Sequence, residues 1–403
     1  MTVHIDACLR RVYYHPHSLR DQFGVAGREL GGGEPVKGRR LTLLLAAAAI
    51  VSLLAVGCTP PAAPTTPTTP GPTTPTPSQP ASQTFKWNLQ MFYPVADPAS
   101  GAMIGVAENI KGSTGGRLQI ECFPVGAIVP AQKEIDSLNQ GVFEATFVSH
   151  GWHTHLYKAS FLFAQRAGGL TPIQAMTWLR LGGGMELADE LYSTLTDVKY
   201  LATMLIHPPE VWCHSNRQLK SMADFMGLKI RSPGDSGAIL SRMGASSVSM
   251  PGAEIYESAQ RGVIDATEYI TQATNWDMGF QEVFKYMYMS PTRAPSDSIG
   301  LFANKTAWNK LPADVQGIVM AEVHAETLRW YAWSLQADSI ALQKFKDYGT
   351  IVETLPADID AKMVEVAGAY FAEMAAGDAM FAKVMNSQNA WKAMCEAQGP
   401  WAD

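Results

Sequence analysis

Between residues 84 and 150, hydrophobic and polar positions follow two alternating patterns. Runs in which every second residue is apolar predict strands, and runs with an apolar residue every three or four positions predict helices. Strands are predicted over residues 84–93, 117–124 and 142–150, with helices over residues 101–116 and 130–141 between them. Such alternation with short connections predicts a parallel sheet flanked by helices.

The same alternation returns after a helical stretch at residues 172–194. Strands are predicted over residues 200–208, 210–215, 228–232, 247–250, 263–270 and 284–290, with helices over residues 237–245 and 253–262. A long helix over residues 313–349, a short strand and two more helices complete the chain. The pattern therefore predicts an α/β fold of two lobes with crossing strands and long C-terminal helices. Ligands of such sheets bind at the carboxyl ends of the strands, which here places a cleft between the lobes.

The composition agrees with an ordinary globular protein, since 47% of its 403 residues are hydrophobic and 17% are charged. A net charge of -6 without a Lys/Arg-rich run in the folded part predicts no binding to nucleic acid. Five segments are predicted: an upstream extension with a lipoprotein signal peptide at residues 1–57, a Pro/Thr-rich linker at residues 58–83, a first lobe at residues 84–205, a second lobe at residues 206–300, and a mostly helical segment at residues 301–403.

The N-terminal segment has the three parts of a secretory signal. A basic stretch that begins at Lys37 precedes the apolar run at residues 41–54, and small residues lead to Cys58. The apolar run is shorter than the stretch that a membrane-spanning helix usually needs. A cysteine directly after small residues resembles the bacterial lipobox, which predicts lipidation of Cys58. An ordinary signal followed by a chance cysteine is the alternative.

The linker after Cys58 consists almost entirely of Pro, Thr, Ala and Ser. Such a segment cannot bury apolar surface and acts as an extended, semi-rigid spacer. Lipid, spacer and globular part together predict an extracytoplasmic protein that is anchored to the cell membrane.

The remaining cysteines and the histidines give little sign of a metal site. Cys122, Cys213 and Cys395 are far apart and have no metal-binding spacing, so we expect free thiols, or one disulfide whose pairing the sequence leaves open. The segment that contains His150, His153 and His155 has no companion ligand at matching spacing, so a transition-metal site there is a weak alternative.

Residues 234–237 read Gly-Asp-Ser-Gly, which resembles the loop that presents the nucleophilic serine of trypsin-like proteases. Such a protease needs a His and an Asp upstream in a β-barrel, where this chain has predicted helices. The alternative is a strand that ends at Arg231, then a turn, then a helix with Ser236 in its first turn. We favour this alternative, with an anchored serine hydrolase as the rival.

Several ordered motifs resemble the solute-binding subunits of TRAP (tripartite ATP-independent periplasmic) transporters. These are residues 126–147, 219–234, 243–269 and 284–316, and the resemblance spans roughly residues 85–395. Residues 176–192 resemble the branch that binds 2-oxo acids and related monocarboxylates. The resemblance implies a two-lobed binding protein that is not an enzyme and that delivers a small organic acid to a membrane permease. A binding protein that serves a signalling receptor is a further alternative, and an oligomer with swapped C-terminal helices is open.

Arg231 is the strongest candidate for ligand binding. It ends a predicted strand before a Pro-Gly turn, where its side chain can project into the cleft. A guanidinium group matches a carboxylate with two parallel donors. A structural ion pair is the alternative from position alone, but the resemblance implies that Arg231 is the carboxylate clamp.

Glu268 and Tyr269 close the predicted strand at residues 263–270. The resemblance implies that Glu268, the Tyr269 main chain and a carboxylate on a later loop hold a Na⁺ or Ca²⁺ ion that bridges to the substrate. That carboxylate is missing here unless Asp297 supplies it, because Arg293 stands in the corresponding stretch. Glu268 paired with Arg231 or Arg293 in an empty cleft is an equal alternative.

Arg293 facing Arg231 would suit a second carboxylate or a larger polar acid, whereas a solvated loop arginine is the plainer alternative. Aromatic residues near the predicted strand ends are candidates for the cleft walls, although each could equally belong to the core. They are Tyr93, Trp152, His153, Tyr157 and Trp212.

Overall fold

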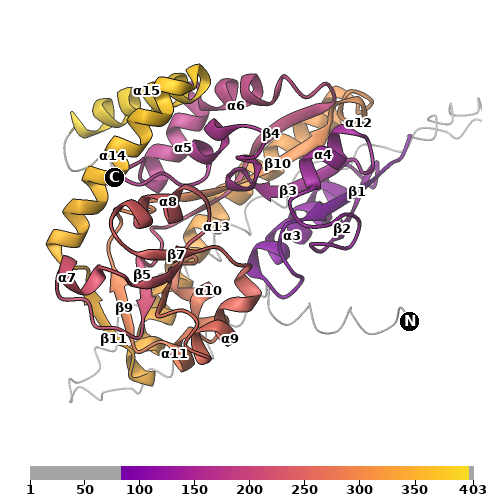
Figure 1. Ribbon diagram of the computed structural model, residues 1–403. Helices are drawn as coiled ribbons and strands as arrows, with labels where there is room; N and C mark the ends of the chain where they lie inside the picture. Colours follow the sequence, from indigo (N-terminus) through magenta and orange to yellow (C-terminus); the bar gives the residue numbers. More distant parts are fainter. Residues whose placement is uncertain (1–82, 399–403) are drawn as a thin grey trace, which may run out of the picture. The chain divides into compact units, whose positions relative to one another are not determined.

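The computed structural model describes residues 83–398 (Figure 1). The predicted signal peptide, the lipidation of Cys58 and nearly all of the linker lie outside the described residues. Among the described residues, no helix is long and apolar enough to cross a membrane.

The first lobe is built on a five-stranded sheet with the order β2-β1-β3-β10-β4. Strand β1 pairs in parallel with β2 and β3, whereas β10 is antiparallel to both β3 and β4. Its strands are β1 (Phe85–Met91), β2 (Leu118–Phe123), β3 (Ala145–Ser149), β4 (Val198–His207) and β10 (Asp297–Asn304). The helices of this lobe are α3 (Pro98–Ser113), α4 (Glu134–Asn139), η2 (His150–His153), η3 (Lys158–Phe163), α5 (Pro172–Leu181) and α6 (Gly184–Tyr192).

The second lobe is built on a six-stranded sheet with the order β11-β9-β5-β8-β6-β7. Its strands are β5 (Cys213–Ser215), β6 (Lys229–Arg231), β7 (Ser246–Val248), β8 (Ala266–Thr267), β9 (Tyr286–Met289) and β11 (Ile351–Thr354). Its helices are α7 (Met222–Phe225), α8 (Gly234–Arg242), η4 (Gly252–Glu254), α9 (Ile255–Gln260), α10 (Gln272–Asp277) and α11 (Phe280–Val283). Strand β6 pairs in parallel with β7 and β8, so their carboxyl ends lie at one edge.

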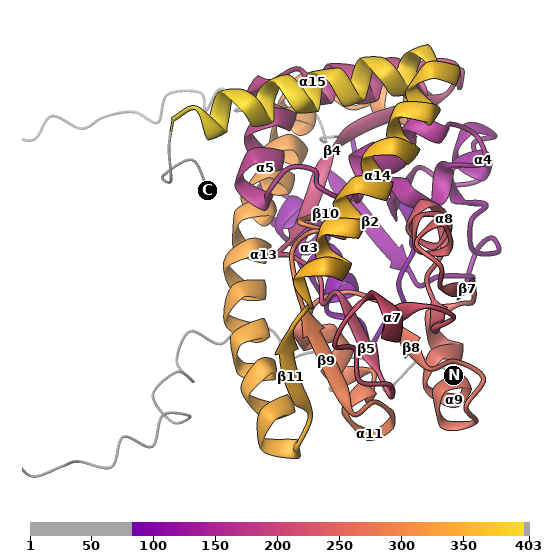
Figure 2. The same ribbon diagram turned by 60° about the vertical axis from the view of Figure 1, so that its left-hand side comes forward.

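The chain crosses between the two sheets several times. Residues 208–212 lead from β4 to β5, and residues 290–296 lead back from β9 to β10. After the short helix α12 (Lys305–Asn309), helix α13 (Ala313–Tyr348) runs beside β4 and continues to β11 (Figure 2). The two-lobed fold with crossing strands is therefore confirmed.

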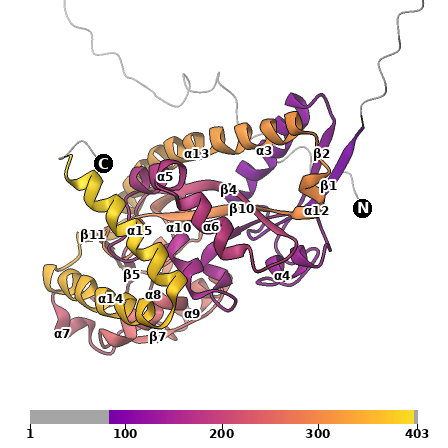
Figure 3. The same ribbon diagram turned by 90° about the horizontal axis from the view of Figure 1, so that it is seen from above.

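The two last helices pack on both lobes within the same chain. Helix α14 (Ala357–Gly377) contacts α7 and α8 of the second lobe, and α15 (Ala379–Glu396) contacts η3, α5 and α6 of the first. Seen from above, α13 and α14 lie on different sides of strands β4 and β10 (Figure 3).

Helix α13 contributes to the hydrophobic cores of both lobes. Val315, Val319 and Trp330 pack with β1 and α3 in the first lobe, and Phe345 packs with Phe280 in the second. A single helix therefore contributes buried side chains to the cores beside both sheets.

The cysteines Cys122, Cys213 and Cys395 are free thiols, so the disulfide alternative does not apply to the described residues.

A buried aromatic cluster in the first lobe surrounds Tyr192. Its hydroxyl group lies 2.9 Å from Nδ1 of His150 and 2.8 Å from Nδ1 of His153. His155 is exposed on the surface. Among the described residues, no group of three or more His, Cys, Asp or Glu could hold a metal ion, so the weak histidine-metal alternative is not supported. Burial lowers the pKa of His150 to about 3 and that of His153 well below its ordinary value.

These histidines make the stability of the fold sensitive to acid. Because their folded-state pKa lies below the unfolded value of about 6.5, their stabilising contribution is complete above that pH and is lost as the pH falls towards the folded-state value. When the pH is lowered from about 7 to about 5, the free energy of unfolding of the wild type should fall. We expect this fall to be smaller in His150→Phe, by about 1–2 kcal/mol. Denaturant unfolding at each pH measures this. The exposed His155→Phe is the control and should follow the wild type, and an unchanged pH slope in His150→Phe would contradict the expectation.

Candidate ligand-binding site

The local fold places Arg231 at the carboxyl edge of the second sheet. It is the last residue of β6, and its partner in the parallel strand β8 is Thr267, so Glu268 follows directly beside it. The chain then turns through Gly234, whose φ of 60° belongs to the left-handed region, into α8. This is the predicted sequence of strand, turn and helix.

The Gly-Asp-Ser-Gly motif is explained by packing. A Cβ atom on Gly237 would lie 2.2 Å from the main-chain oxygen of Ser232, so only glycine lets α8 approach the end of β6 this closely. Ser236 is buried in the first turn of α8, as predicted.

The guanidinium group of Arg231 is held almost entirely by main-chain oxygens and one carboxylate. Its Nε donates to the main-chain oxygen of Met250 at 3.1 Å, and its Nη1 donates to the main-chain oxygen of Glu268 at 3.1 Å and to Oε1 of Glu268 at 3.2 Å. The ring of Tyr269 lies 5.6 Å from the guanidinium carbon. A Cβ atom on Gly252 would lie 2.7 Å from this ring, so glycine leaves room for it.

Arg293 is more deeply buried, with 1% of its surface exposed. Its Nε donates to the main-chain oxygen of Trp212 at 3.1 Å. Its Nη2 donates to Oε2 of Glu210 at 2.6 Å and to the main-chain oxygen of Val211 at 3.1 Å. Its Nη1 lies 2.9 Å from Oε2 of Glu268. The alternative of a solvated loop arginine is therefore wrong.

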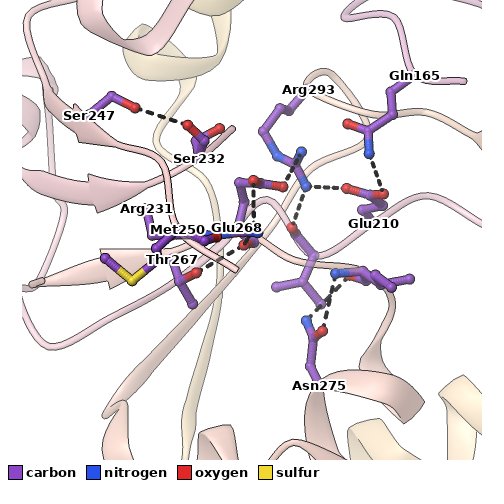
Figure 4. A network of polar contacts seen from close by, with 12 residues as sticks. Gln165, Glu210, Arg231, Ser232, Ser247, Met250, Thr267, Glu268, Asn275 and Arg293 are labelled. Carbon is purple, nitrogen blue, oxygen red and sulfur yellow. Dashed lines mark hydrogen bonds and ion pairs between the residues drawn. The ribbon is translucent and has the colours of Figure 1, made fainter. Parts of the chain in front are cut away.

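The Glu268 carboxylate lies between the two arginines (Figure 4). Its Oε1 faces Arg231 and its Oε2 faces Arg293, so one negative charge bridges two buried positive charges. Glu268 was predicted either to hold a cation or to pair with Arg231 or Arg293. In the structure it forms ion pairs with both arginines.

Sequence reasoning missed Glu210 and Gln165. Glu210 belongs to the crossing segment 208–212 and pairs with Arg293, and Gln165 of the first lobe donates to Oε1 of Glu210 at 3.1 Å. Gln165 also lies 3.5 Å from Oδ2 of Asp297, at the start of β10. The sequence feature that could have revealed Glu210 is its place as a single acidic residue in the apolar stretch "HPPEVWC". An acidic side chain is almost never buried in such a stretch without a partner.

The burial of these groups changes their protonation. Burial raises the pKa of the Glu210 carboxyl group, while the Arg293 guanidinium opposes this rise. Burial raises the pKa of Asp297 to about 7. Burial alone would lower the pKa of Arg293, but Glu268 and Glu210 together raise it, so this arginine stays charged. The positive charge of Arg293 thus faces the Glu210 carboxyl group, whose ionised form burial disfavours.

The predicted aromatic residues divide into two groups. The Tyr93 ring packs on Phe92 and Phe147, and burial raises its pKa well above the ordinary value, with smaller contributions from the charges of Asp297 and Asp97. Trp152 packs on Phe92, with ring centroids 5.0 Å apart.

His153 and Tyr157 instead pack against Tyr192 in the aromatic cluster of the first lobe. The indole of Trp212 packs on Phe225 in the core, and only its main-chain oxygen reaches Arg293.

Of the groups that would hold the implied Na⁺ or Ca²⁺, namely Glu268, the Tyr269 main chain and Asp297, the Glu268 carboxylate is engaged by arginines. Both carboxylate oxygens of Glu268 face guanidinium groups, and the Glu268 main-chain oxygen accepts from Arg231 and Thr267. Among the described residues, Asp297 does not complete a group of metal-ligating side chains with Glu268. The Glu268 carboxylate, which the prediction placed on a cation, therefore has two guanidinium groups as its counter-charges.

The fold and this charged site define a two-lobed solute-binding protein. A family model for the bacterial extracellular solute-binding proteins of family 7 (DctP) matches residues 91–378, and the chain belongs to this family. The predicted resemblance to TRAP solute-binding subunits is confirmed, and the chain is a binding protein rather than an enzyme.

Similar proteins include the monocarboxylate 2-oxoacid-binding periplasmic protein of Nostoc sp., which is 26% identical over 78% of this chain and 85% of the relative. A TRAP periplasmic solute-binding protein from Colwellia psychrerythraea, solved with calcium and pyruvate, has a TM-score of 0.74 and 24% identity over 78% of this chain and 96% of that one. A similar protein from Pseudoalteromonas atlantica, solved with sodium and pyruvate, has a TM-score of 0.74 and 24% identity over 80% of this chain and 98% of that one.

Removal of the bridging carboxylate tests the role of Glu268. In Glu268→Ala, two buried guanidinium groups lose their shared counter-charge, and we expect the free energy of unfolding to fall by about 3–5 kcal/mol. Glu268→Gln should recover part of this loss through its side-chain oxygen. Denaturant unfolding measures both variants, with Glu373→Ala as the control because its ion pair with Arg242 is exposed and should matter little. Equal effects of Glu268→Ala and Glu373→Ala would refute the bridging role.

Proposed function

We propose that this protein binds a small organic acid, a 2-oxo acid or a related carboxylate, and delivers it to the membrane permease of a TRAP transporter. The observation that carries the proposal is the convergence of two buried guanidinium groups on one carboxylate, Glu268, at the carboxyl edge of the second sheet. Guanidinium groups recognise carboxylates through planar pairs of donors, and such pairs are most effective away from water.

Both arginines keep donor capacity for a ligand. The hydrogen bonds of Arg231 to described residues use Nε and Nη1, so its Nη2 is available to an incoming oxygen. Nη1 of Arg293 is buried and pairs with Glu268 by charge, but no described oxygen accepts a hydrogen bond from it. A ligand carboxylate beside Glu268 would therefore find one donor from each arginine.

The groups around the arginines come from both lobes and from the crossing segments. Tyr93 and Gln165 belong to the first lobe, whereas Arg231, Glu268 and Tyr269 belong to the second. We expect Tyr269 and Tyr93 to recognise the polar group next to the carboxylate. A ligand that contacts both lobes stabilises the closed state, because part of its contacts exists only there.

The names of the similar proteins support a carboxylate ligand. The Nostoc relative is named for monocarboxylate 2-oxoacids, and the two similar structures hold pyruvate. These structures also hold calcium or sodium, the two ions predicted as possible for this chain, but the proposal does not depend on either.

The anchor and the permease complete the proposed function. Lipidation of Cys58 and the Pro/Thr-rich spacer would keep the protein near the permease on the outer face of the membrane. Stable anchoring needs more than one acyl chain, so full lipidation of Cys58 is part of the proposal. Delivery to a signalling receptor is the alternative.

Thermal unfolding with organic acids tests the site. We expect the wild type to be stabilised by pyruvate, a branched 2-oxo acid or a dicarboxylate, by about 2.7 kcal/mol when the ligand is at about 100 times its Kd. Arg231→Ala should lose most of this stabilisation because it removes the proposed clamp. Arg242→Ala, whose guanidinium group is exposed at the end of α8, is the matched control and should respond like the wild type. If Arg231→Ala responds fully, Arg231 is structural and the assignment fails.

Membrane fractionation in a bacterial host tests the anchor. The wild type should sediment with membranes and incorporate labelled fatty acid, whereas Cys58→Ser should be released in soluble form without label. Cys122→Ser is the control for loss of a cysteine elsewhere. Label that persists in Cys58→Ser would show that the attachment lies at another residue.

A further inference from the structure

We infer that the guanidinium group of Arg293 takes the place of an inorganic cation in this protein, so that its organic acid binds without Na⁺ or Ca²⁺. The inference rests on the proposed function in one respect, namely that the ligand carries a carboxylate. Its structural basis is independent of the identity of the ligand.

The oxygen atoms around Arg293 are those that a hard cation would take. They are carboxylate oxygens of Glu268 and Glu210, at 2.9 and 2.6 Å from Nη1 and Nη2, and the main-chain oxygens of Trp212 and Val211, both at 3.1 Å. Two carboxylates and two carbonyl groups are a typical partial ligand set for Ca²⁺ or Na⁺. Here the positive charge at their centre is covalently part of the chain.

Arg293 is held in this position from both sides. The segment 290–296 is attached to the second lobe by hydrogen bonds from Ser290 and Thr292 to the carboxylate of Asp360 at the start of α14. The main-chain oxygen of Thr292 accepts from Gly168 of the first lobe at 2.8 Å, and that of Ala294 accepts from Glu210 at 3.1 Å. The guanidinium group is therefore part of a fixed structure rather than a side chain that swings in from solvent.

A metal ion cannot share this set with the arginine. A divalent cation among these oxygens would be repelled by the positive charge of the guanidinium group at close range, where water screens little. The same oxygens already balance the charge of Arg293, so the ion would gain no unpaired ligand in return. Without the Arg293 charge, the carboxylates of Glu268 and Glu210 would lose a shared counter-charge and could bind a metal ion in its place.

Arg293 also provides what a bridging cation gives a ligand, which is a positive group in direct contact with its oxygen. Nη1 is fully buried, faces Glu268 and lacks a hydrogen-bond acceptor among the described residues. The guanidinium differs from an ion in two respects: its donors lie in one plane, and no chelator can remove it.

Cation titrations of the wild type and two matched variants test the inference. For the wild type, we expect less than a twofold change in Kd for the organic acid when a chelator is added, and when sodium is replaced by a larger organic cation. Arg293→Met removes the charge and keeps much of the volume. It should bind the acid at least tenfold more weakly without calcium and recover affinity when calcium is added. Arg293→Lys keeps a positive charge and should remain indifferent to calcium.

A second readout works without any organic acid. Calcium alone should raise the melting temperature of Arg293→Met, and terbium should give sensitised luminescence in this variant, whereas the wild type and Arg293→Lys should show neither. This result would hold even if no organic acid bound and the proposed function failed. A tenfold loss of ligand affinity in the chelated wild type would overturn the inference, as would calcium stabilisation of the wild type equal to that of Arg293→Met. If Arg293→Met folds only with calcium, the inference is supported. If it does not fold at all, the test is the Kd of the wild type for the organic acid in the presence of a chelator.

Discussion

The site depends on a single carboxylate that is shared by two buried guanidinium groups. Arg231 and Arg293 would repel each other strongly without Glu268, and Glu268 could not be buried without them. Arg293 extends the arrangement to Glu210, and Gln165 links Glu210 to the first lobe. Charge balance in a water-poor environment therefore connects both lobes and both crossing segments. The same balance limits which ligands can enter, since an anion must find donors that Glu268 has not satisfied.

Most of the fold could be predicted because its strands and helices have different hydrophobic periods. The alternation at residues 84–93 predicted β1, and the predicted helical stretch at residues 172–194 forms α5 and α6. Strand β10 was missed as a strand. All eight of its residues are buried, because β3 and β4 flank it and its faces are covered, and a strand buried on both faces shows no alternation.

The site was predictable only in part, for a related reason. Arg231 and Glu268 end strands, and strand ends can be found from the sequence pattern. The partners of Arg293 lie more than eighty residues away in the sequence at Glu210 and Trp212, and no local pattern encodes such a distance. The resemblance also implied a carboxylate in the stretch where this chain has Arg293, and the structure pairs that arginine with Glu210 and Glu268. In the structure, the departure from the family pattern, Arg293 itself, is the informative residue.

Helix α13 has a mechanical consequence for how this protein can open. With 36 residues it is about 54 Å long, and its side chains belong to the cores of both lobes. Because its side chains are buried in both cores, we expect a movement of one lobe against the other to change backbone torsions outside this helix. The crossings at residues 208–212 and 290–296 also connect the lobes, and hydrogen bonds hold the second of them to both lobes. Because these crossings carry Glu210 and Arg293, we expect any opening movement of the lobes to change the geometry of that ion pair.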